Sequence, residues 1–132
     1  MVEADGIIVG SPVYYAGING TLKSFLDRAF YASSSKFKYK VGASVIAQRR
    51  AGALPAFDQI NKYFAISEMV TVGASYWNMA FGAGEGEALQ DDEGMQNMRV
   101  LGKNVAWLIK TIKEGKVEKP ETEKKIKMNF IR

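Results

Sequence analysis

The residues best able to do chemistry lie early in the chain, at residues 11–17. They follow an apolar run, residues 7–9, which predicts a short buried strand covered on both faces. Gly10 lets the backbone turn, and Pro12 removes a hydrogen-bond donor and fixes φ, so the strand is expected to end there. Ligands of open α/β sheets bind outside the carboxyl ends of the strands. A loop with two tyrosines and a glycine at this place could therefore hold a flat ring.

The composition excludes several kinds of catalytic and metal site. The chain contains no cysteine, which excludes disulfides, thiolate nucleophiles and cysteine-bound metals. It also contains no histidine, the usual general base. Any chemistry must therefore come from carboxylates, lysines, tyrosines or a bound cofactor. With 132 residues, 47% of them hydrophobic, the chain is long enough for one compact domain.

The net charge of +4 comes entirely from the end of the chain, where residues 110–132 hold eight basic side chains against four glutamates. A basic tail can contact nucleic acid. The interleaved glutamates and the scarcity of aromatic residues favour a solvated extension instead. No segment approaches the roughly 18 apolar residues of a membrane span, and no signal-peptide pattern opens the chain. The expected location is therefore the cytoplasm.

Three strands, each followed by a helix, are needed to position the tyrosine loop. The strands are predicted at residues 7–9, 41–47 and 69–73. Amphipathic helices are predicted to begin near Asn19, Pro55 and residues 91–93, with a long loop over residues 74–90 before the third. Single crossovers in this order predict a parallel three-stranded sheet with right-handed connections. The first helix is expected to bury one face, formed by Ile18, Leu22, Phe25, Leu26, Ala29 and Phe30.

Several segments resemble one known family, the flavodoxin-like NAD(P)H-dependent FMN reductases, which include the iron–sulfur flavoproteins. The clearest is ADGIIVGSPVYY at residues 4–15, which resembles the family's third strand. The helix that follows carries the matching residues Gly20, Lys23, Phe25, Asp27 and Arg28. Residues 49–52 resemble the loop after the fourth strand, and residues 76–78 and 92–95 resemble the loop and helix after the fifth. Altogether the resemblance covers residues 4–113.

The resemblance implies an α/β fold, a truncated flavodoxin-like three-layer sandwich with helices on both faces of its sheet. A full domain has five parallel strands in the order 2-1-3-4-5, and this chain supplies counterparts of the third, fourth and fifth. Residues 1–113 would then be a partial FMN-binding domain, and residues 114–132 a charged extension. The first two strands, the phosphate-binding loop and the region of the cluster cysteines have no counterpart.

The missing strands leave the strand at Gly6, which is central in the full fold, at an edge of the sheet. A flat apolar edge invites pairing with another chain, so we expect a homo-oligomer, either a dimer or a tetramer. A remnant of this kind could act only as a self-associating module without catalysis. The loss of about three phosphate contacts, at about 1.5–3 kcal/mol each, would weaken FMN binding roughly a thousandfold or more.

The resemblance implies an oxidoreductase that transfers electrons through bound FMN, with NAD(P)H as the electron donor. Such a flavoprotein needs no ionised side chain for its central step, because the ring carries the electrons. The lack of histidine and cysteine is therefore compatible with this activity. No catalytic side chain and no metal ligand is predicted.

Three groups of residues are implied as the cofactor site. The first flanks the ring, largely through backbone groups: Ser11, Pro12, Val13, Tyr14, Tyr15 and Gly17. The second brings positive charge and close backbone approach to the ring or to the phosphates of the nicotinamide cofactor: Arg49, Arg50 and Gly52. The third forms the opposite rim or covers the ring in a neighbouring subunit's site: Tyr76, Trp77 and Asn78. The alternatives are that the tyrosines pack on a neighbouring helix or subunit, that residues 49–52 form a solvated loop, and that residues 76–78 bury a subunit contact.

Overall fold

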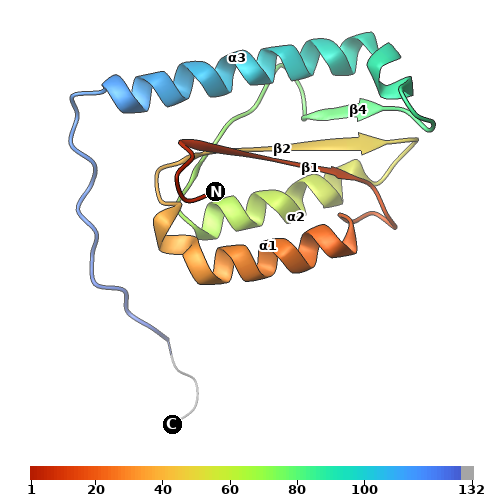
Figure 1. The fold of residues 1–132 in the computed structure, drawn as a ribbon. Helices are drawn as coiled ribbons and strands as arrows, with labels where there is room; N and C mark the ends of the chain where they lie inside the picture. The colour runs from red at the N-terminus through yellow and green to blue at the C-terminus, as the bar shows by residue number, and fades with distance from the viewer. Residues whose placement is uncertain (129–132) are drawn as a thin grey trace.

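Three helices cover the two faces of a parallel sheet in the computed structural model, which describes residues 1–128 (Figure 1). The strands are β1 (Gly6–Pro12), β2 (Val41–Gln48), β3 (Val70–Thr71) and β4 (Met79–Phe81). The helices are α1 (Gly20–Ser33), α2 (Ala53–Ile66) and α3 (Asp92–Glu114), with short 3-10 turns η1 (Ser34–Lys36) and η2 (Glu87–Gln90). The predicted α/β class, the parallel sheet and the helices on both faces are confirmed.

The strand β2 is the centre of the sheet. On one side it pairs with β1, from Gly6 opposite Val41 to Pro12 opposite Ala47. On its other side both β3 and β4 pair with it. These two short strands therefore lie one after the other along β2 and form a third, interrupted line of the sheet. The predicted strand at residues 69–73 is therefore only partly right, and the prediction of loop at residues 79–81 was wrong. Three residues are too few to show a strand period in the sequence.

Each face of the sheet has its own apolar core. On one face α1 and α2 pack against β1 and β2 with Leu26, Phe30, Ile60 and Phe64, all of them buried. On the other face α3 buries Leu101 and Val105 against Val41 and Ala43 of β2. These two layers carry the apolar faces that the helical periodicity predicts.

The first helix begins as predicted, because the Asn19 side chain accepts a hydrogen bond from the Leu22 N–H at 3.1 Å. One member of its predicted buried face was assigned wrongly. The Phe25 side chain is 54% exposed, while the neighbouring Leu26 is 1% exposed. Two adjacent apolar positions on a helix lie about 100° apart, and only the second of them faces the sheet here.

The prediction that β1 is covered on both faces was wrong. Ile7 and Val9 are buried, but Ile8 between them is 55% exposed. The reason is the position of α3, which packs over β2 and the interrupted third line and approaches β1 only near Gly6. Among the described residues β1 has a strand partner on one side only, so it is an edge strand as expected.

Residues 115–128 form neither helix nor strand and are exposed. Figure 1 shows this segment leaving the body of the molecule after α3. It contacts the corner before β2, where the Tyr39 hydroxyl donates to the Pro120 carbonyl at 3.4 Å. The division at residue 113 stays a prediction, and residues 129–132 of the predicted extension lie outside the described residues. Within residues 1–128 no helix has the length and hydropathy needed to cross a bilayer.

Close packing of β2 against α2 leaves no room for a side chain at Gly42. A β-carbon at this position would lie 2.9 Å from Phe64 Cγ and 3.2 Å from Met69 Cε. We expect Gly42→Ala to lower the free energy of unfolding by about 1–3 kcal/mol, because overpacking forces the neighbours apart. Urea denaturation measures the change. Gly73→Ala is the control, since nothing lies within 4 Å of its β-carbon position, and equal losses in both variants would contradict this account.

Candidate functional site

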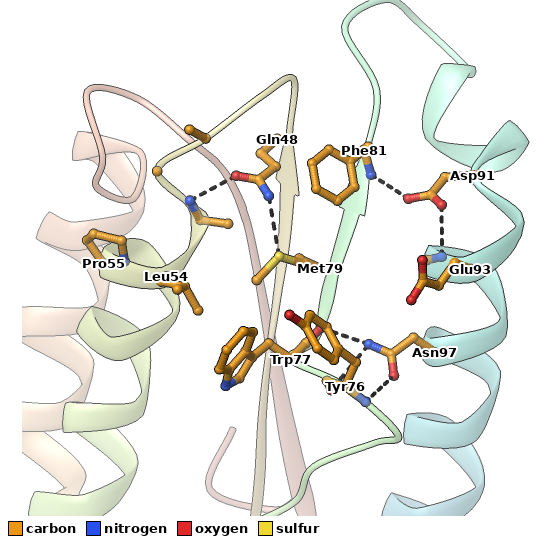
Figure 2. Close-up of a pocket in the computed structure, with 14 residues that line it drawn as sticks. Gln48, Leu54, Pro55, Tyr76, Trp77, Met79, Phe81, Asp91, Glu93 and Asn97 are labelled. Carbon is orange, nitrogen blue, oxygen red and sulfur yellow. Dashed lines mark hydrogen bonds between the residues drawn. The ribbon is translucent and has the colours of Figure 1, made fainter.

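A pocket of about 480 Å³ opens at the carboxyl ends of β2 and β4, between the start of α2 and the start of α3 (Figure 2). This is the edge of the sheet where the sequence places a ligand site. The pocket is lined by Gln48, Ala51, Gly52, Ala53, Leu54, Pro55, Tyr76, Trp77, Met79, Phe81, Asp91, Glu93, Gly94 and Asn97.

The walls of the pocket are mainly apolar and aromatic. Leu54 and Pro55 line it from the first turn of α2, and Tyr76 and Trp77 line it from the loop before β4. The Tyr76 and Trp77 rings contact each other edge to face, with centroids 4.7 Å apart. Both aromatic side chains remain about half exposed, at 57% and 47%. Such a surface can pack against the faces of a planar ligand.

A buried amide, Gln48, fixes the α2 side of the pocket. Its Oε1 accepts a hydrogen bond from the Ala53 N–H at 3.0 Å, and its Nε2 donates to the Met79 sulfur at 3.3 Å. The amide therefore ties the start of α2 to β4 across the end of β2. Gly52 precedes the helix with φ at +94°, a conformation that favours glycine.

The α3 side of the pocket carries carboxylates. Asp91 caps α3 by accepting from the Gly94 N–H at 2.9 Å, and it also accepts from the Phe81 N–H at 2.7 Å. These backbone hydrogen bonds, with that from Gly94 the stronger influence, lower the pKa of the Asp91 carboxyl below its usual value. Glu93 adds a second carboxylate to the lining, which contains no lysine or arginine. An anionic group would therefore be repelled from this rim.

A second, shallower hollow shares Phe81 and Asp91 with the pocket and contains Arg49. Its loop is closed by Glu87, whose carboxylate accepts from the Ala83 N–H at 2.7 Å and the Gly84 N–H at 2.9 Å. The hydrogen bonds from Gly84 and Ala83 lower the pKa of Glu87, and the charge of Arg49 adds a smaller effect in the same direction. The arginine therefore lies beside the pocket without lining it.

The tyrosine loop adopts a tight, unusual turn. Tyr14 and Gly17 exchange two backbone hydrogen bonds of 2.9 and 3.0 Å, and the two residues between them have positive φ, 48° for Tyr15 and 58° for Ala16. This conformation is uncommon for residues other than glycine. It leaves the Tyr15 side chain fully exposed and that of Tyr14 55% exposed. Such outliers are found preferentially at ligand-binding sites.

The tyrosine loop lies directly behind one wall of the pocket. A β-carbon on Gly52 would be 3.0 Å from Val13 Cγ1 and 3.1 Å from Ala16 Cα. The loop therefore supports Gly52, which lines the pocket, although none of residues 11–17 lines the pocket itself. The loops after β1 and β2 form one continuous surface at the carboxyl end of the sheet.

Two of the predicted site residues are buried and hydrogen-bonded within the protein. Ser11 is 5% exposed, and its hydroxyl oxygen accepts from the Asn19 N–H at 3.0 Å. Asn78 is 1% exposed, and its backbone carbonyl accepts from the Ile46 N–H at 2.9 Å. The Asn78 Oδ1 has no hydrogen-bond partner among the described residues. Pro12 and Arg50 are exposed outside the pocket.

Of the residues predicted for the site, the structure brings Gly52, Tyr76 and Trp77 together in the pocket. Their role toward a cofactor stays a prediction. The sequence reasoning missed the other eleven lining residues, which include Gln48, Leu54, Phe81, Asp91 and Asn97. A signal for Asn97 was present, because this polar residue occupies a step of the apolar face of α3 that continues with Leu101 and Val105.

Comparison with known proteins identifies the family. The sequence profile of the NADPH-dependent FMN reductases matches residues 1–84. The chain belongs to this family. It is 38% identical over 122 residues to an iron–sulfur flavoprotein of Methanocaldococcus jannaschii. The alignment covers 86% of this chain and 63% of that protein. An iron–sulfur flavoprotein of Methanosarcina thermophila is 31% identical over 121 residues, with 88% of this chain and 62% of that protein covered.

This member of the family spans a little over three fifths of the length of these curated relatives. Its fold matches solved flavodoxin-like structures. The Trp repressor binding protein of Bacillus subtilis aligns with a TM-score of 0.63 and 21% identity over 76% of this chain and 65% of that one. A flavodoxin from the domain Archaea aligns with a TM-score of 0.60 and 23% identity over 82% and 67%. The predicted flavodoxin-like fold is thereby confirmed.

The hydrogen bonds of Asp91 predict a pH-dependent contribution to stability. Because its folded pKa is lowered, the contribution is present above the unfolded pKa and is lost as the pH falls through the folded pKa. At neutral pH we expect Asp91→Ala to lower the free energy of unfolding by about 1 kcal/mol, the usual effect of losing an N-cap. Urea denaturation at several pH values measures the difference from wild type, which should vanish in acid. Asp92→Ala is the control, and a pH-independent loss for Asp91→Ala would contradict the assignment.

Proposed function

We propose that this chain binds the ring of FMN at the carboxyl end of its sheet and serves as an oxidoreductase that transfers electrons through it. The observation that carries the proposal is the aromatic pocket at the ends of β2 and β4 in a chain of the FMN reductase family. NAD(P)H is the proposed electron donor. A cytoplasmic location remains a prediction from the sequence.

The residues of the pocket fit a flavin ring. A volume of about 480 Å³ lies in the usual range for sites that enclose small planar ligands. Leu54 and Trp77 offer an apolar and an aromatic surface, and the exposed Tyr14 and Tyr15 extend the surface on the β1 side. The Leu54 N–H, at the second helical position, lacks an intrahelical acceptor and can donate to the polar edge of the ring.

The protein groups act by binding and orientation. FMN, when bound, supplies the electron-carrying chemistry. Gln48 holds the first turn of α2, Asp91 joins β4 to α3, and the aromatic pair at residues 76–77 shields one side of the pocket from water. No side chain in the lining is assigned a proton-transfer role.

The lining of the pocket offers no positively charged side chain to the phosphate of FMN. Asp91 and Glu93 give the rim the same sign of charge as a phosphate. Arg49 and Arg50 are exposed just outside it, on the loop after β2. Ring recognition should therefore exceed phosphate recognition, and the two arginines are the proposed contacts for the ring or for the phosphates of the nicotinamide nucleotide.

The proposal predicts that FMN and riboflavin, which lacks the phosphate, bind with dissociation constants within about threefold of one another. The binding free energies of the two flavins would then differ by less than the contribution of one charge-assisted hydrogen bond. Quenching of flavin fluorescence on titration with the protein measures both constants. Leu54→Asp, which places charge against the ring, should abolish binding of both flavins, while Leu89→Asp, at an exposed leucine outside the pocket, should leave both unchanged. Failure of either flavin to bind at millimolar concentration would overturn the proposal.

A second candidate function rests on the uncovered strand β1. Its outer edge lacks a strand partner among the described residues, and Ile8 exposes an apolar side chain on the face that α3 leaves open. Unprotected edges of this kind pair with other chains. We infer that β1 is the contact of a homo-oligomer, with or without flavin.

Self-association through β1 predicts that Ile8→Lys lowers the molar mass in solution to that of one chain, because a buried lysine opposes edge pairing. Light scattering coupled to size-exclusion chromatography measures the mass. The control is Ile66→Lys, because this isoleucine is 75% exposed but lies at the end of α2 and not on β1. A wild-type protein that runs as a single chain would exclude this contact.

A further inference from the structure

The amide of Asn97 on α3 makes four hydrogen bonds to one three-residue segment of the loop before β4. Its Oδ1 accepts from the Tyr76 N–H at 3.1 Å and from the Ser75 hydroxyl at 3.2 Å. Its Nδ2 donates to the Trp77 carbonyl at 2.8 Å and to the Tyr76 carbonyl at 3.3 Å. Figure 2 shows the amide lying between α3 and the backbone of the two aromatic residues. All hydrogen-bonding capacity of this side chain is thus directed at one loop.

The loop between β3 and β4 is anchored at its two ends, where the Val72 N–H donates to the Gly42 carbonyl at 3.0 Å and the backbone carbonyl of Asn78 accepts from the Ile46 N–H at 2.9 Å. Between these anchors, residues 75–77 are exposed. The aromatic side chains of Tyr76 and Trp77 are about half exposed, so burial does not fix them. The Asn97 side chain is 3% exposed. A fully satisfied buried amide of this kind fixes backbone geometry more firmly than the side-chain contacts of an exposed loop.

We propose that Asn97 is a positioning residue that holds the Tyr76–Trp77 pair as a rigid wall against the bound flavin ring. The inference rests on the proposed flavin site. The amide acts through the backbone of residues 75–77 and does not itself need to contact the ring. A preformed wall strengthens ring binding, because the loop does not lose conformational freedom when the ligand arrives.

The same helix offers a matched control. Asn104 donates one hydrogen bond from its Nδ2 to the Gly73 carbonyl at 3.0 Å, at the beginning of the same loop but outside the pocket. Asn97→Ala and Asn104→Ala therefore both remove an asparagine that connects α3 to this loop. Only the first should release the aromatic wall.

The first measurement needs no ligand. The chain has two tryptophans, and Trp107 is an exposed residue of α3, so a Trp107→Phe background leaves Trp77 as the only reporter. In this background we expect Asn97→Ala to lower the fluorescence anisotropy of Trp77 and to increase its quenching by acrylamide. Asn104→Ala should change neither. Equal anisotropy in both variants would overturn the positioning role of Asn97.

The second measurement is the dissociation constant of FMN in the same variants. Asn97→Ala should raise it about tenfold, the effect of losing one well-placed interaction, and Asn104→Ala should leave it within about twofold. A mobile Trp77 with unchanged FMN affinity would overturn the contact between wall and ring. A wild-type chain that binds no FMN would overturn the proposed function instead, and the anisotropy alone would then decide whether Asn97 positions the wall.

A third variant distinguishes loss of the Asn97 hydrogen-bond donor from loss of the fold. Asn97→Asp keeps the acceptor for the Tyr76 N–H but can donate to the Trp77 carbonyl only when its carboxyl is protonated. We expect FMN affinity and Trp77 anisotropy in this variant to be low at neutral pH and to recover as the pH is lowered, with no such recovery in Asn97→Ala. The absence of recovery in a variant that circular dichroism shows to be folded would overturn the role of the Asn97 donor.

Discussion

The pairing of β2 on both of its edges is the constraint on which the remaining structure depends. Its residues are almost all buried, because α2 covers one face and α3 the other. Every loop of the candidate site starts from a strand whose register is fixed by β2: the loop after β1, the loop after β2 itself, and the segment around β4. The pocket therefore inherits its shape from one rigid strand.

Polar groups at the end of β2 extend this rigidity into the loops. Gln48, its last residue, joins α2 to β4, while Asn97 joins α3 to the loop before β4 and Asp91 joins α3 to β4 itself. Buried or partly buried polar groups are unfavourable unless their hydrogen bonds are satisfied. A hydrogen bond forms only when donor and acceptor lie at a fixed distance. The hydrogen bonds of these side chains therefore disfavour other positions of the loops. The apolar walls of the pocket are then free to remain exposed for a ligand.

The parts of the fold that could be predicted are those with a clear apolar pattern. The helix after Asn19 shows a cap and a helical period, and the strands at residues 7–9 and 41–47 show as apolar runs followed by turn or loop residues. β4 could not be predicted, because three residues after an aromatic loop show no period. The exposure of Ile8 was equally hidden, since the apolar pattern of a strand does not reveal which helices lie above it.

The site was predictable only in its location. Residues of the loops after β1 and β2 were expected there from the rule for parallel sheets, and Gly52, Tyr76 and Trp77 do line the pocket. Gln48 and Asn97 escaped prediction because their partners lie on other elements, and only the folded register shows that an amide meets a loop. The tyrosine turn makes the same point. Positive φ at Tyr15 and Ala16 costs about 1–3 kcal/mol per residue, and the two hydrogen bonds between Tyr14 and Gly17 and the close packing on Gly52 oppose this cost.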